Sequence, residues 1–363
     1  MNILILTTHL NKGGISRYVI NLAKGLSLQG HKVFIASSGG EWVSELRNLN
    51  IMHKDISIKT KSICSLKILF SFFALSGFII TNKIDIIHAN TRVTQFLAYL
   101  LYKKSKIPYL SSFHGFYRPK KFRKLFKFSG LLAIAVSKSV SCHLKEDLEI
   151  DPDIIKVVYN GIDLESSDQG ISKRSQAGLS SDDFILGILG RISAEKGHLL
   201  AVEALSRLVP KYDNLFLLLS GRGKHQDKLN SLIDNLKLEK KVKFIDSEAA
   251  DFLKTINILL VPSEKEGFGF AVVEAFAGGV AVIGYNTGGI AEIIQNRSNG
   301  ILFNHYDSLV LADAIEELMT KGQLRQRMVA KAKEDVHNYS LENMASGTLR
   351  VYAGAIDLRE KSS

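Results

Sequence analysis

Two glutamates lie on either side of a short glycine-rich turn, and their spacing suggests a site that holds hydroxyl groups. The segment is Glu266-Gly-Phe-Gly-Phe-Ala-Val-Val-Glu274, and it follows an apolar run, Ile256–Pro262, that is typical of a buried strand. A strand, a glycine loop and a helix in this order point backbone N–H groups into a pocket where anions bind. Carboxylates in such a pocket would repel a phosphate but can accept hydrogen bonds from sugar hydroxyls. The pair therefore suggests a sugar nucleotide, with one acid for each sugar ring.

Each glutamate also has a simpler interpretation when it is considered alone. Glu266 fits an acid at a helix N-terminus, and Glu274 fits a solvated helix position. The surroundings of Glu274 argue against the second interpretation, because residues 271–277 are otherwise apolar. A carboxylate on a buried helix needs a partner or a ligand.

The positive charge that a departing diphosphate requires is found in a glycine-bounded loop, Gly190–Gly197. Arg191 can form paired hydrogen bonds to phosphate oxygens, and Lys196 can supply a point charge. Read alone, the two residues also fit an exposed loop at a helix start. A metal would need acidic ligands, but the only Asp-x-Asp, Asp151-Pro-Asp153, fits a turn before a strand. We therefore expect no metal site. A full dinucleotide-binding glycine motif and a Walker loop are both absent, which disfavours NAD and ATP.

Strand-like apolar runs alternate with helical patterns along all 363 residues, which is enough chain for two domains. The expected strands are Ile3–Leu6, Val33–Ala36, Ile84–His88, Tyr109–Ser112, Leu132–Val136, Ile155–Tyr159, Ile185–Leu189, Leu215–Ser220, Val242–Ile245, Ile258–Val261 and Val280–Tyr285. This alternation predicts an α/β fold with parallel sheets. A polar stretch at Glu165–Ser181 divides the chain into lobes 1–166 and 167–340, and the final helix, 341–363, is expected to return to the first lobe. Two facing doubly wound lobes would bind ligands at the carboxyl ends of their strands.

The net charge of +11 is concentrated in the first lobe. Residues 1–165 contain 23 Lys and Arg against 11 Asp and Glu, and no acid occurs between Asp85 and Glu146. The densest basic run is Arg118–Lys127, in which Phe122, Leu125 and Phe126 are interleaved, with Phe128 directly after it. Such a segment suits an anionic membrane surface, although it also suits nucleic acid or a solvated helix face.

A second feature favours the membrane over nucleic acid. Residues Ile68–Ile80 form a run of thirteen without a charge, too short to span a bilayer but long enough for an interfacial or a buried core helix. The N-terminus fits a first strand better than a signal peptide, and two cysteines, Cys64 and Cys142, are too few for a disulfide framework. We therefore expect a cytoplasmic protein bound peripherally to the inner face of the cytoplasmic membrane, with no nucleic-acid partner.

The chain resembles the retaining GT-B glycosyltransferases of family 4 (glycosyl transferases group 1) over nearly its whole length. In the second lobe the resemblance lies in LGRISAEKG, LLLSGRGK, LLVPSEKEGFGFAVVEAFAGGVAVIGYNTGGIAEII and NGILF. In the first lobe it lies in GGISRYVINLAKGLSLQGHKV, IDIIHAN, SSFHG, AIAVSKSV and VVYNGID. The E-x7-E pair within the long second-lobe segment is its most specific element.

The resemblance implies a role for each matching position. Arg191 and Lys196 would bind the diphosphate, Glu266 the donor sugar and Glu274 the ribose hydroxyls. His114 would approach the transferred sugar from the first, acceptor-side lobe, although a histidine there also fits a structural role at a strand end. The remaining donor-binding positions implied are Gly13, Gly14, Gly190, Gly221, Arg222, Gly267, Phe268 and Gly269.

The family transfers sugar with retention, without a metal and without a cofactor other than the nucleotide-diphosphate sugar itself. The basic first lobe and its apolar run then make transfer to a hydroxyl of a lipid-linked or lipopolysaccharide-core glycan, a glycan or glycolipid acceptor, the leading hypothesis. Two positions depart from the pattern: Ala281 replaces a frequent proline, and Asp246 replaces a frequent glycine near the base. The choice among UDP-, GDP- and ADP-sugar donors therefore remains open. The alternatives are a GT-B-like sugar-nucleotide epimerase and a non-catalytic sugar-nucleotide-binding subunit.

Overall fold

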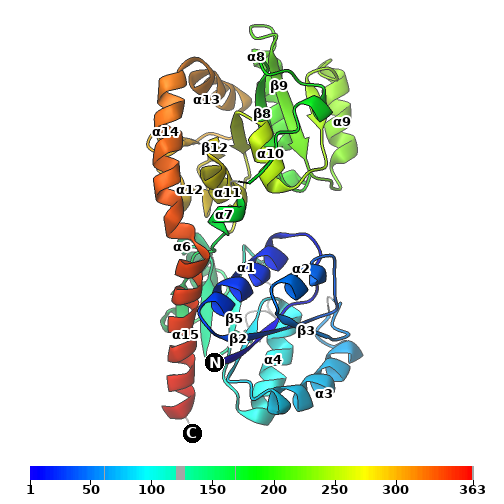
Figure 1. The fold of residues 1–363 in the computed structure, drawn as a ribbon, viewed down its shortest axis with the longest axis vertical. Helices are drawn as coiled ribbons and strands as arrows, with labels where there is room; N and C mark the ends of the chain where they lie inside the picture. Colours follow the sequence, from blue (N-terminus) through cyan, green and yellow to red (C-terminus); the bar gives the residue numbers. More distant parts are fainter. Residues whose placement is uncertain (61, 120–126, 168, 362–363) are drawn as a thin grey trace. The chain divides into compact units, whose positions relative to one another are not determined.

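The chain folds into two compact units (Figure 1). The computed structural model describes residues 1–60, 62–119, 127–167 and 169–361. Unit 1 comprises residues 1–161 and 340–363, and unit 2 comprises residues 162–339. The chain thus leaves unit 1 shortly before the boundary predicted at residue 166, and it returns next to the predicted residue 341.

Unit 1 is built on a seven-stranded sheet in the order β3-β2-β1-β4-β5-β6-β7, in which every pairing is parallel. Its strands are β1 (Asn2–Leu6), β2 (Lys32–Ser37), β3 (Met52–Asp55), β4 (Ile86–Ala89), β5 (Tyr109–Phe113), β6 (Leu132–Ala135) and β7 (Ile155–Val157). The central strands β4, β5 and β6 are buried at every position, because helices cover both faces of a doubly wound sheet. The predicted parallel α/β architecture is confirmed here.

Helices flank this sheet, and the last helix of the chain is one of them. They are α1 (Gly14–Leu28), α2 (Val43–Asn48), α3 (Leu66–Thr81), α4 (Arg92–Ser105), α6 (Lys138–Glu146), the 3₁₀ turn η1 (Pro152–Ile154) and α15 (Leu341–Lys361). Asp151 caps η1 by accepting a hydrogen bond from the Asp153 backbone, so this pair forms the predicted turn. Helix α15, the predicted returning helix, packs against α1, β5 and β6 of unit 1.

Unit 2 repeats the arrangement with six parallel strands in the order β10-β9-β8-β11-β12-β13. The strands are β8 (Phe184–Leu189), β9 (Leu215–Ser220), β10 (Val242–Phe244), β11 (Ile258–Val261), β12 (Ala281–Tyr285) and β13 (Ile301–Phe303). The helices are α7 (Leu164–Ser167), η2 (Ser175–Ala177), η3 (Ala194–Lys196), α8 (His198–Leu208), α9 (Gln226–Asn235), α10 (Ala249–Thr255), α11 (Phe270–Gly278), α12 (Ile290–Ile293), α13 (Ser308–Thr320), α14 (Gly322–Asp335) and η4 (Val336–Tyr339). A core of aliphatic side chains fills the space between β8, β9, β11 and helices α8 and α13.

Two strands, β3 and β13, were not predicted from the sequence. Strand β3 reads Met-His-Lys-Asp and is partly exposed, so it lacks the apolar run that marks a buried strand. Strand β13 has only three residues. Both lie at sheet edges, where pairing to one neighbour is enough to form a strand.

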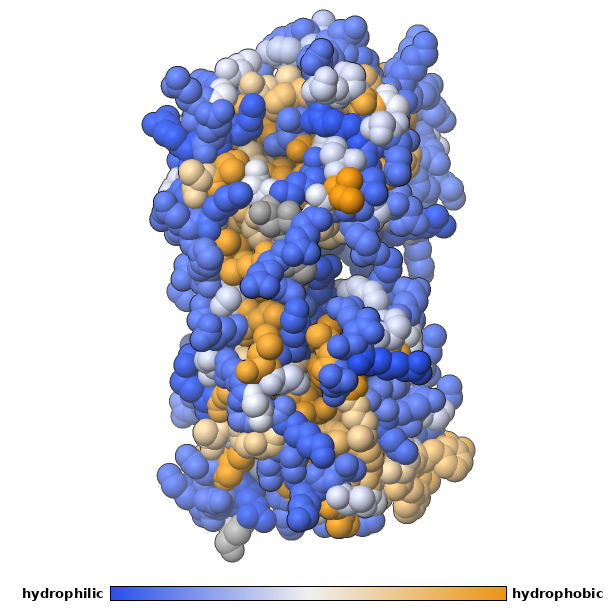
Figure 2. All heavy atoms as spheres, viewed as in Figure 1, coloured by the Kyte–Doolittle hydropathy of each residue, from blue (hydrophilic) through white to orange (hydrophobic). Residues whose placement is uncertain are grey.

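Helix α3 contains the predicted uncharged run Ile68–Ile80 and has two apolar faces. Ile68, Leu75 and Ile79 are buried against α4 and the sheet. The other face, here called the α3 apolar face, is exposed and consists of Leu66, Leu69, Phe70, Phe73 and Ile80. Figure 2 shows hydrophobic side chains gathered over the part of unit 1 where Figure 1 draws α3. Among the described helices, none is long and apolar enough to cross a bilayer.

A chain of buried polar side chains joins α15 to the sheet of unit 1. The hydroxyl of Tyr352 lies 2.8 Å from His88 Nδ1, and His88 Nε2 lies 2.7 Å from Ser112 Oγ. Ser112 Oγ is in turn 2.9 Å from the hydroxyl of Tyr18 on α1. Neutral imidazole satisfies both neighbours with one donor and one acceptor, and burial lowers the pKa of His88 to about 3, with a smaller contribution from His114.

This burial predicts that unit 1 loses stability in mild acid. Unfolded histidine takes up a proton below its usual pKa of 6.5, whereas folded His88 stays neutral down to about pH 3. The unfolded chain binds more protons between these values, so the free energy of unfolding should fall with pH by up to about 1.4 kcal/mol per unit. Urea unfolding followed by the fluorescence of Trp42, the single tryptophan of the chain, would measure this in unit 1.

The matched variants are His88→Gln and His305→Gln. His88→Gln should reduce the slope by up to about 1.4 kcal/mol per pH unit and leave the share of buried His114. The exposed His305→Gln should preserve the full slope. An unchanged slope in His88→Gln would show that His88 is not the group responsible.

Candidate functional site

The loop between β11 and α11 carries both sequence-predicted glutamates. Gly269 precedes the first residue of α11 with φ 113°, a left-handed conformation that favours glycine, so the chain turns sharply into the helix. Glu266 lies in the loop at the carboxyl end of β11. Glu274 lies within α11 and is only 5% exposed, as predicted for its apolar surroundings.

Lys196 and Glu266, 70 residues apart in sequence, form an ion pair at this edge of the sheet. Lys196 Nζ lies 2.5 Å from Glu266 Oε2, and the side chains are 27% and 20% exposed. The backbone enforces the contact, because the Glu264 N–H donates to the Glu195 carbonyl over 2.9 Å. The loops that follow the neighbouring strands β8 and β11 are thus joined directly beside the pair. A carboxylate that can accept from hydroxyls and a cation that can bind phosphate are therefore brought together.

A third loop, Thr287–Gly289 after β12, fixes the Glu266 loop from its other side. The Gly289 N–H donates to the Glu266 carbonyl over 2.9 Å, and Thr287 Oγ1 donates to the Glu264 carbonyl over 3.1 Å. A Cβ on Gly289 would lie 2.3 Å from the Phe268 carbonyl oxygen, so only glycine fits. Gly288 and Gly289 were given no role from the sequence alone. Their place directly after a predicted strand was a usable signal.

The other predicted donor-side residues surround this centre at the ends of β8 and β9. A Cβ on Gly221 would lie 2.1 Å from the Gly190 carbonyl oxygen, so these two glycines allow the two loops to touch. Arg191 is exposed and pairs with Glu195 at 3.3 Å rather than with the central carboxylate. Arg222 and Asp246, both exposed, lie 3.5 Å apart, so the residue that departs from the family pattern faces a predicted donor-binding arginine. Exposed pairs of this kind are weak, and a ligand can replace them.

His198 is a residue of this region that the sequence analysis missed. It begins α8, is 3% exposed, and its two ring nitrogens have no hydrogen-bond partner among the described residues. Burial, with a smaller contribution from the charge of Lys196, lowers its pKa to about 4, so the ring is neutral at physiological pH. In the sequence, His198 lies between the cationic loop Gly190–Gly197 and an apolar helix, and this position could have identified it as a candidate site residue.

His114 follows β5 in unit 1, where its neighbours hold it in place. Its Nε2 lies 3.1 Å from Asn90 Oδ1, and the ring of Tyr18 meets it edge-on at 4.6 Å between centroids. Burial lowers the pKa of His114 to about 3, so it is a neutral hydrogen-bonding group rather than a cation. Gly13 and Gly14 are exposed at the start of α1, where nothing lies within 4 Å of a Cβ position on Gly14.

The predicted basic run lies mostly outside the part of the chain that the structure describes. Residues 120–126, most of the basic run Arg118–Lys127, lie outside the described residues. Among the residues that are described, no group of three His, Cys, Asp or Glu side chains is placed to hold a metal ion.

Two family models match the chain, one for each lobe. The model of glycosyl transferases group 1 matches residues 171–335, and that of Glycosyltransferase Family 4 matches residues 12–166. An uncharacterized glycosyltransferase of Methanocaldococcus jannaschii is 27% identical over 95% of both chains. The D-inositol 3-phosphate glycosyltransferase of Corynebacterium glutamicum is 24% identical over 95% of this chain and 93% of its own.

Solved structures with the same fold include a glycosyltransferase from Rickettsia africae, with a TM-score of 0.87 and 28% identity over 98% of both chains. Anabaena HepE in complex with UDP-glucose has a TM-score of 0.85 and 20% identity, over 98% of this chain and all of HepE. WaaG, a glycosyltransferase involved in lipopolysaccharide biosynthesis, has a TM-score of 0.75 and 15% identity, over 97% of this chain and all of WaaG. The predicted GT-B fold is confirmed.

The packing around Gly289 makes a testable prediction. Gly289→Ala should displace the Glu266 loop, lower the stability of unit 2 by about 1–3 kcal/mol and weaken nucleotide-sugar binding. Gly322→Ala is the matched control, because nothing lies within 4 Å of its Cβ position. Thermal unfolding and calorimetric titration with UDP-glucose would measure both effects. Equal behaviour of the two variants would refute the role of Gly289.

Proposed function

Because this chain is a GT-B glycosyltransferase that belongs to group 1, with a first lobe of family 4, we propose a specific reaction for it. It moves a sugar from a nucleotide-diphosphate sugar to a hydroxyl of a lipid-linked or lipopolysaccharide-core glycan. The transfer retains the configuration at the anomeric carbon and uses neither metal nor cofactor.

The observation that carries the proposal is the contact between Lys196 and Glu266. A donor sugar joined to a diphosphate presents hydroxyls on one side and negative charge on the other, and this pair offers a group for each. Glu266, with the backbone N–H groups of Gly267, Phe268 and Gly269, holds the transferred sugar. Lys196 and Arg191 bind the diphosphate.

The rest of the donor fits the surrounding residues. Glu274 on α11 accepts from the ribose hydroxyls, and Gly221 and Arg222 lie beside the base and phosphate. The complex of Anabaena HepE with UDP-glucose supports a UDP-sugar as the first donor to test. GDP- and ADP-sugars remain the alternatives, because the Arg222–Asp246 pair near the base does not distinguish among the three nucleotides.

Charge builds up on the diphosphate as its bond to the anomeric carbon breaks. The acceptor oxygen attacks from the same face, and its proton passes to the departing phosphate oxygen. Lys196 and Arg191 stabilise the developing charge, and the contact of Lys196 with Glu266 pre-organises the site before the donor binds. In unit 1, His114 is neutral and can donate or accept a hydrogen bond.

Two alternatives predict different products. A sugar-nucleotide epimerase would convert the donor without an acceptor, and a non-catalytic subunit would bind the donor without breaking it. The joint presence of Arg191, Lys196, Glu266 and Glu274 favours a working transferase. A small polyol phosphate, as named for the relative in Corynebacterium glutamicum, is a second acceptor class to test.

The proposed place of action is the inner face of the cytoplasmic membrane, to which the protein binds peripherally. The α3 apolar face supports this, because interfacial helices insert exposed aromatic and aliphatic side chains among lipid headgroups. Lysines adjoin it: Lys67 lies on α3 itself, and Lys104 Nζ on α4 lies 5.3 Å from the ring centroid of Phe72. Positive charge beside an apolar face suits anionic lipids.

The reaction is tested with a panel of UDP-, GDP- and ADP-sugars. The true donor should raise the melting temperature, because it binds only the folded chain. With that donor, Lys196→Ala and Arg191→Ala should each lower kcat about 100-fold or more, whereas Glu274→Gln should mainly raise KM. Arg297→Ala, which breaks an exposed pair with Glu317, is the control and should be neutral. An inverted product anomer by NMR, or full turnover in the Lys196 and Arg191 variants, would contradict the mechanism.

The membrane proposal is tested by vesicle flotation. The double variant Phe70→Ser with Phe73→Ser should bind phosphatidylglycerol vesicles at least about tenfold more weakly, because each phenylalanine contributes apolar area. The control, Leu28→Ser with Ile171→Ser, removes two equally exposed apolar side chains elsewhere and should float normally. Failure of the wild-type chain to float would remove the proposal.

A further inference from the structure

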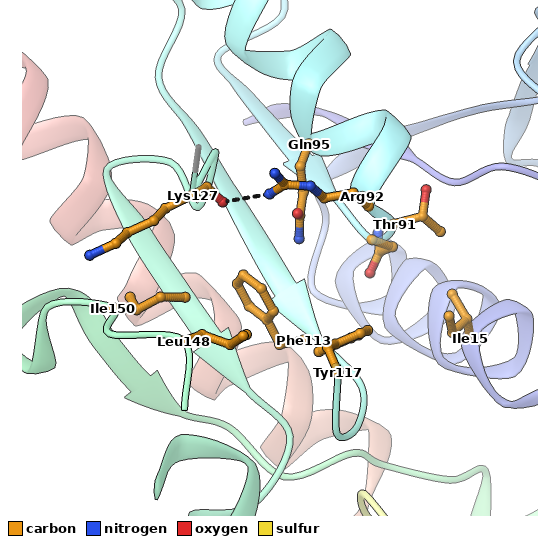
Figure 3. A pocket seen from close by; sticks show the side chains of 10 residues that line it. Ile15, Thr91, Arg92, Gln95, Phe113, Tyr117, Lys127, Leu148 and Ile150 are labelled. Carbon is orange, nitrogen blue, oxygen red and sulfur yellow. Dashed lines mark hydrogen bonds between the residues drawn. The ribbon is translucent and has the colours of Figure 1, made fainter. Parts of the chain in front are cut away.

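Unit 1 contains a pocket at the carboxyl end of its sheet, close to where β4 and β5 end. Its volume is about 110 Å³, and its lining comes from α1, the start of α4, β5 and the segment after α6. Phe113, Leu148 and Ile150 form an apolar wall, and Ile15 and Tyr117 complete it (Figure 3). Cavities of comparable size accept molecules as small as benzene.

Several polar side chains line this apolar space, and one of them is Gln95. Figure 3 shows Gln95 extending from α4 toward the pocket, above Phe113. Gln95 is only 4% exposed, and its side chain forms no hydrogen bond with the residues that the structure describes. Its amide atoms are not among the fully buried ones that lack a partner, so water can reach them through the pocket. A ligand that both donates and accepts can replace that water.

The rim of the pocket is positively charged. Arg92 lies there, with its guanidinium 5.0 Å from the ring centroid of Phe128 and donating to the Lys127 carbonyl over 3.2 Å (Figure 3). Lys127 also lines the pocket and contacts the carbonyl of Glu149. The occupant therefore meets apolar carbon, an amide and cationic groups within one pocket.

We propose that this pocket, here called the Gln95 pocket, binds an apolar group of the acceptor next to a polar linkage. This rests on the proposed transferase function and narrows its acceptor. The apolar group has about five or six carbons within the pocket, given the volume. Gln95 hydrogen-bonds the oxygen that links it to the sugar or phosphate, and Arg92 and Lys127 attract a phosphate at the rim. A lipid-linked acceptor has this combination of groups, whereas a purely hydrophilic core oligosaccharide or polyol phosphate would leave the apolar wall unused.

The test measures binding alone, without a donor. Methyl, butyl, hexyl and octyl β-D-glucoside, each below its micelle-forming concentration, are titrated into the full chain and followed by saturation-transfer NMR. The background is the Phe70→Ser, Phe73→Ser variant, so that the α3 apolar face does not contribute. Affinity should rise about fourfold for each CH₂ until the pocket is full, with saturation strongest on the alkyl protons.

Two variants assign the binding to the Gln95 pocket. Ile15→Phe fills it and should abolish the dependence on chain length. Gln95→Leu removes the amide and should weaken hexyl glucoside binding about tenfold. Gln323→Leu, an exposed position on α14, is the control and should leave this binding unchanged.

Equal affinity for methyl and hexyl glucoside would overturn the proposal, as would chain-length dependence that survives Ile15→Phe. The experiment contains no nucleotide sugar, so its outcome is independent of the donor screen. Absence of any nucleotide-sugar binding would contradict the proposed transferase while leaving this pocket's result intact.

Discussion

The candidate site in unit 2 depends on one contact, the ion pair between Lys196 and Glu266. Each side chain is partly withdrawn from water, so each would be costly there without the other. The pair can form only because three loops after β8, β11 and β12 are joined by backbone hydrogen bonds and by glycines that leave no room for a Cβ. Apart from the Thr287 hydroxyl, backbone groups hold these loops together, which leaves the ionisable groups for a ligand. A donor can then exchange one set of polar contacts for another without rearranging the backbone.

In unit 1, buried polar side chains form a hydrogen-bonded network that connects separate elements of the core. The side chains of Tyr352, His88, Ser112 and Tyr18 connect α15, two strands and α1 within a core that is otherwise apolar. Such a network is stable only when every member has its partner, so it fixes how α15 packs. Tyr18 also contacts the ring of His114. The position of a predicted site residue in unit 1 therefore depends on a helix that comes more than 200 residues later in the sequence.

The sequence was most informative where a single local signal was sufficient. Long apolar runs identified the central strands, and the apolar surroundings of Glu274 indicated its burial. Strand β3 could not be found in this way, because its partly exposed residues Met52–Asp55 carry no apolar pattern and depend on pairing with β2. The pairing of Lys196 with Glu266, and not with Glu195, was equally hidden, since it depends on which strands are neighbours in the sheet. Gln95 looked like an ordinary helix residue, and only the packing around it reveals an amide inside an apolar pocket.

Helix α4 connects the two apolar features of unit 1. Its side packs against α3, whose outer surface is the α3 apolar face, and its first turns carry Arg92 and Gln95 at the Gln95 pocket. The pocket and the α3 apolar face thus lie on neighbouring helices of unit 1. The proposed lipid-linked acceptor would use both features, with one end in the bilayer and the other bound in the Gln95 pocket. A water-soluble acceptor would gain nothing from the α3 apolar face, so the two proposals point to the same class of acceptor.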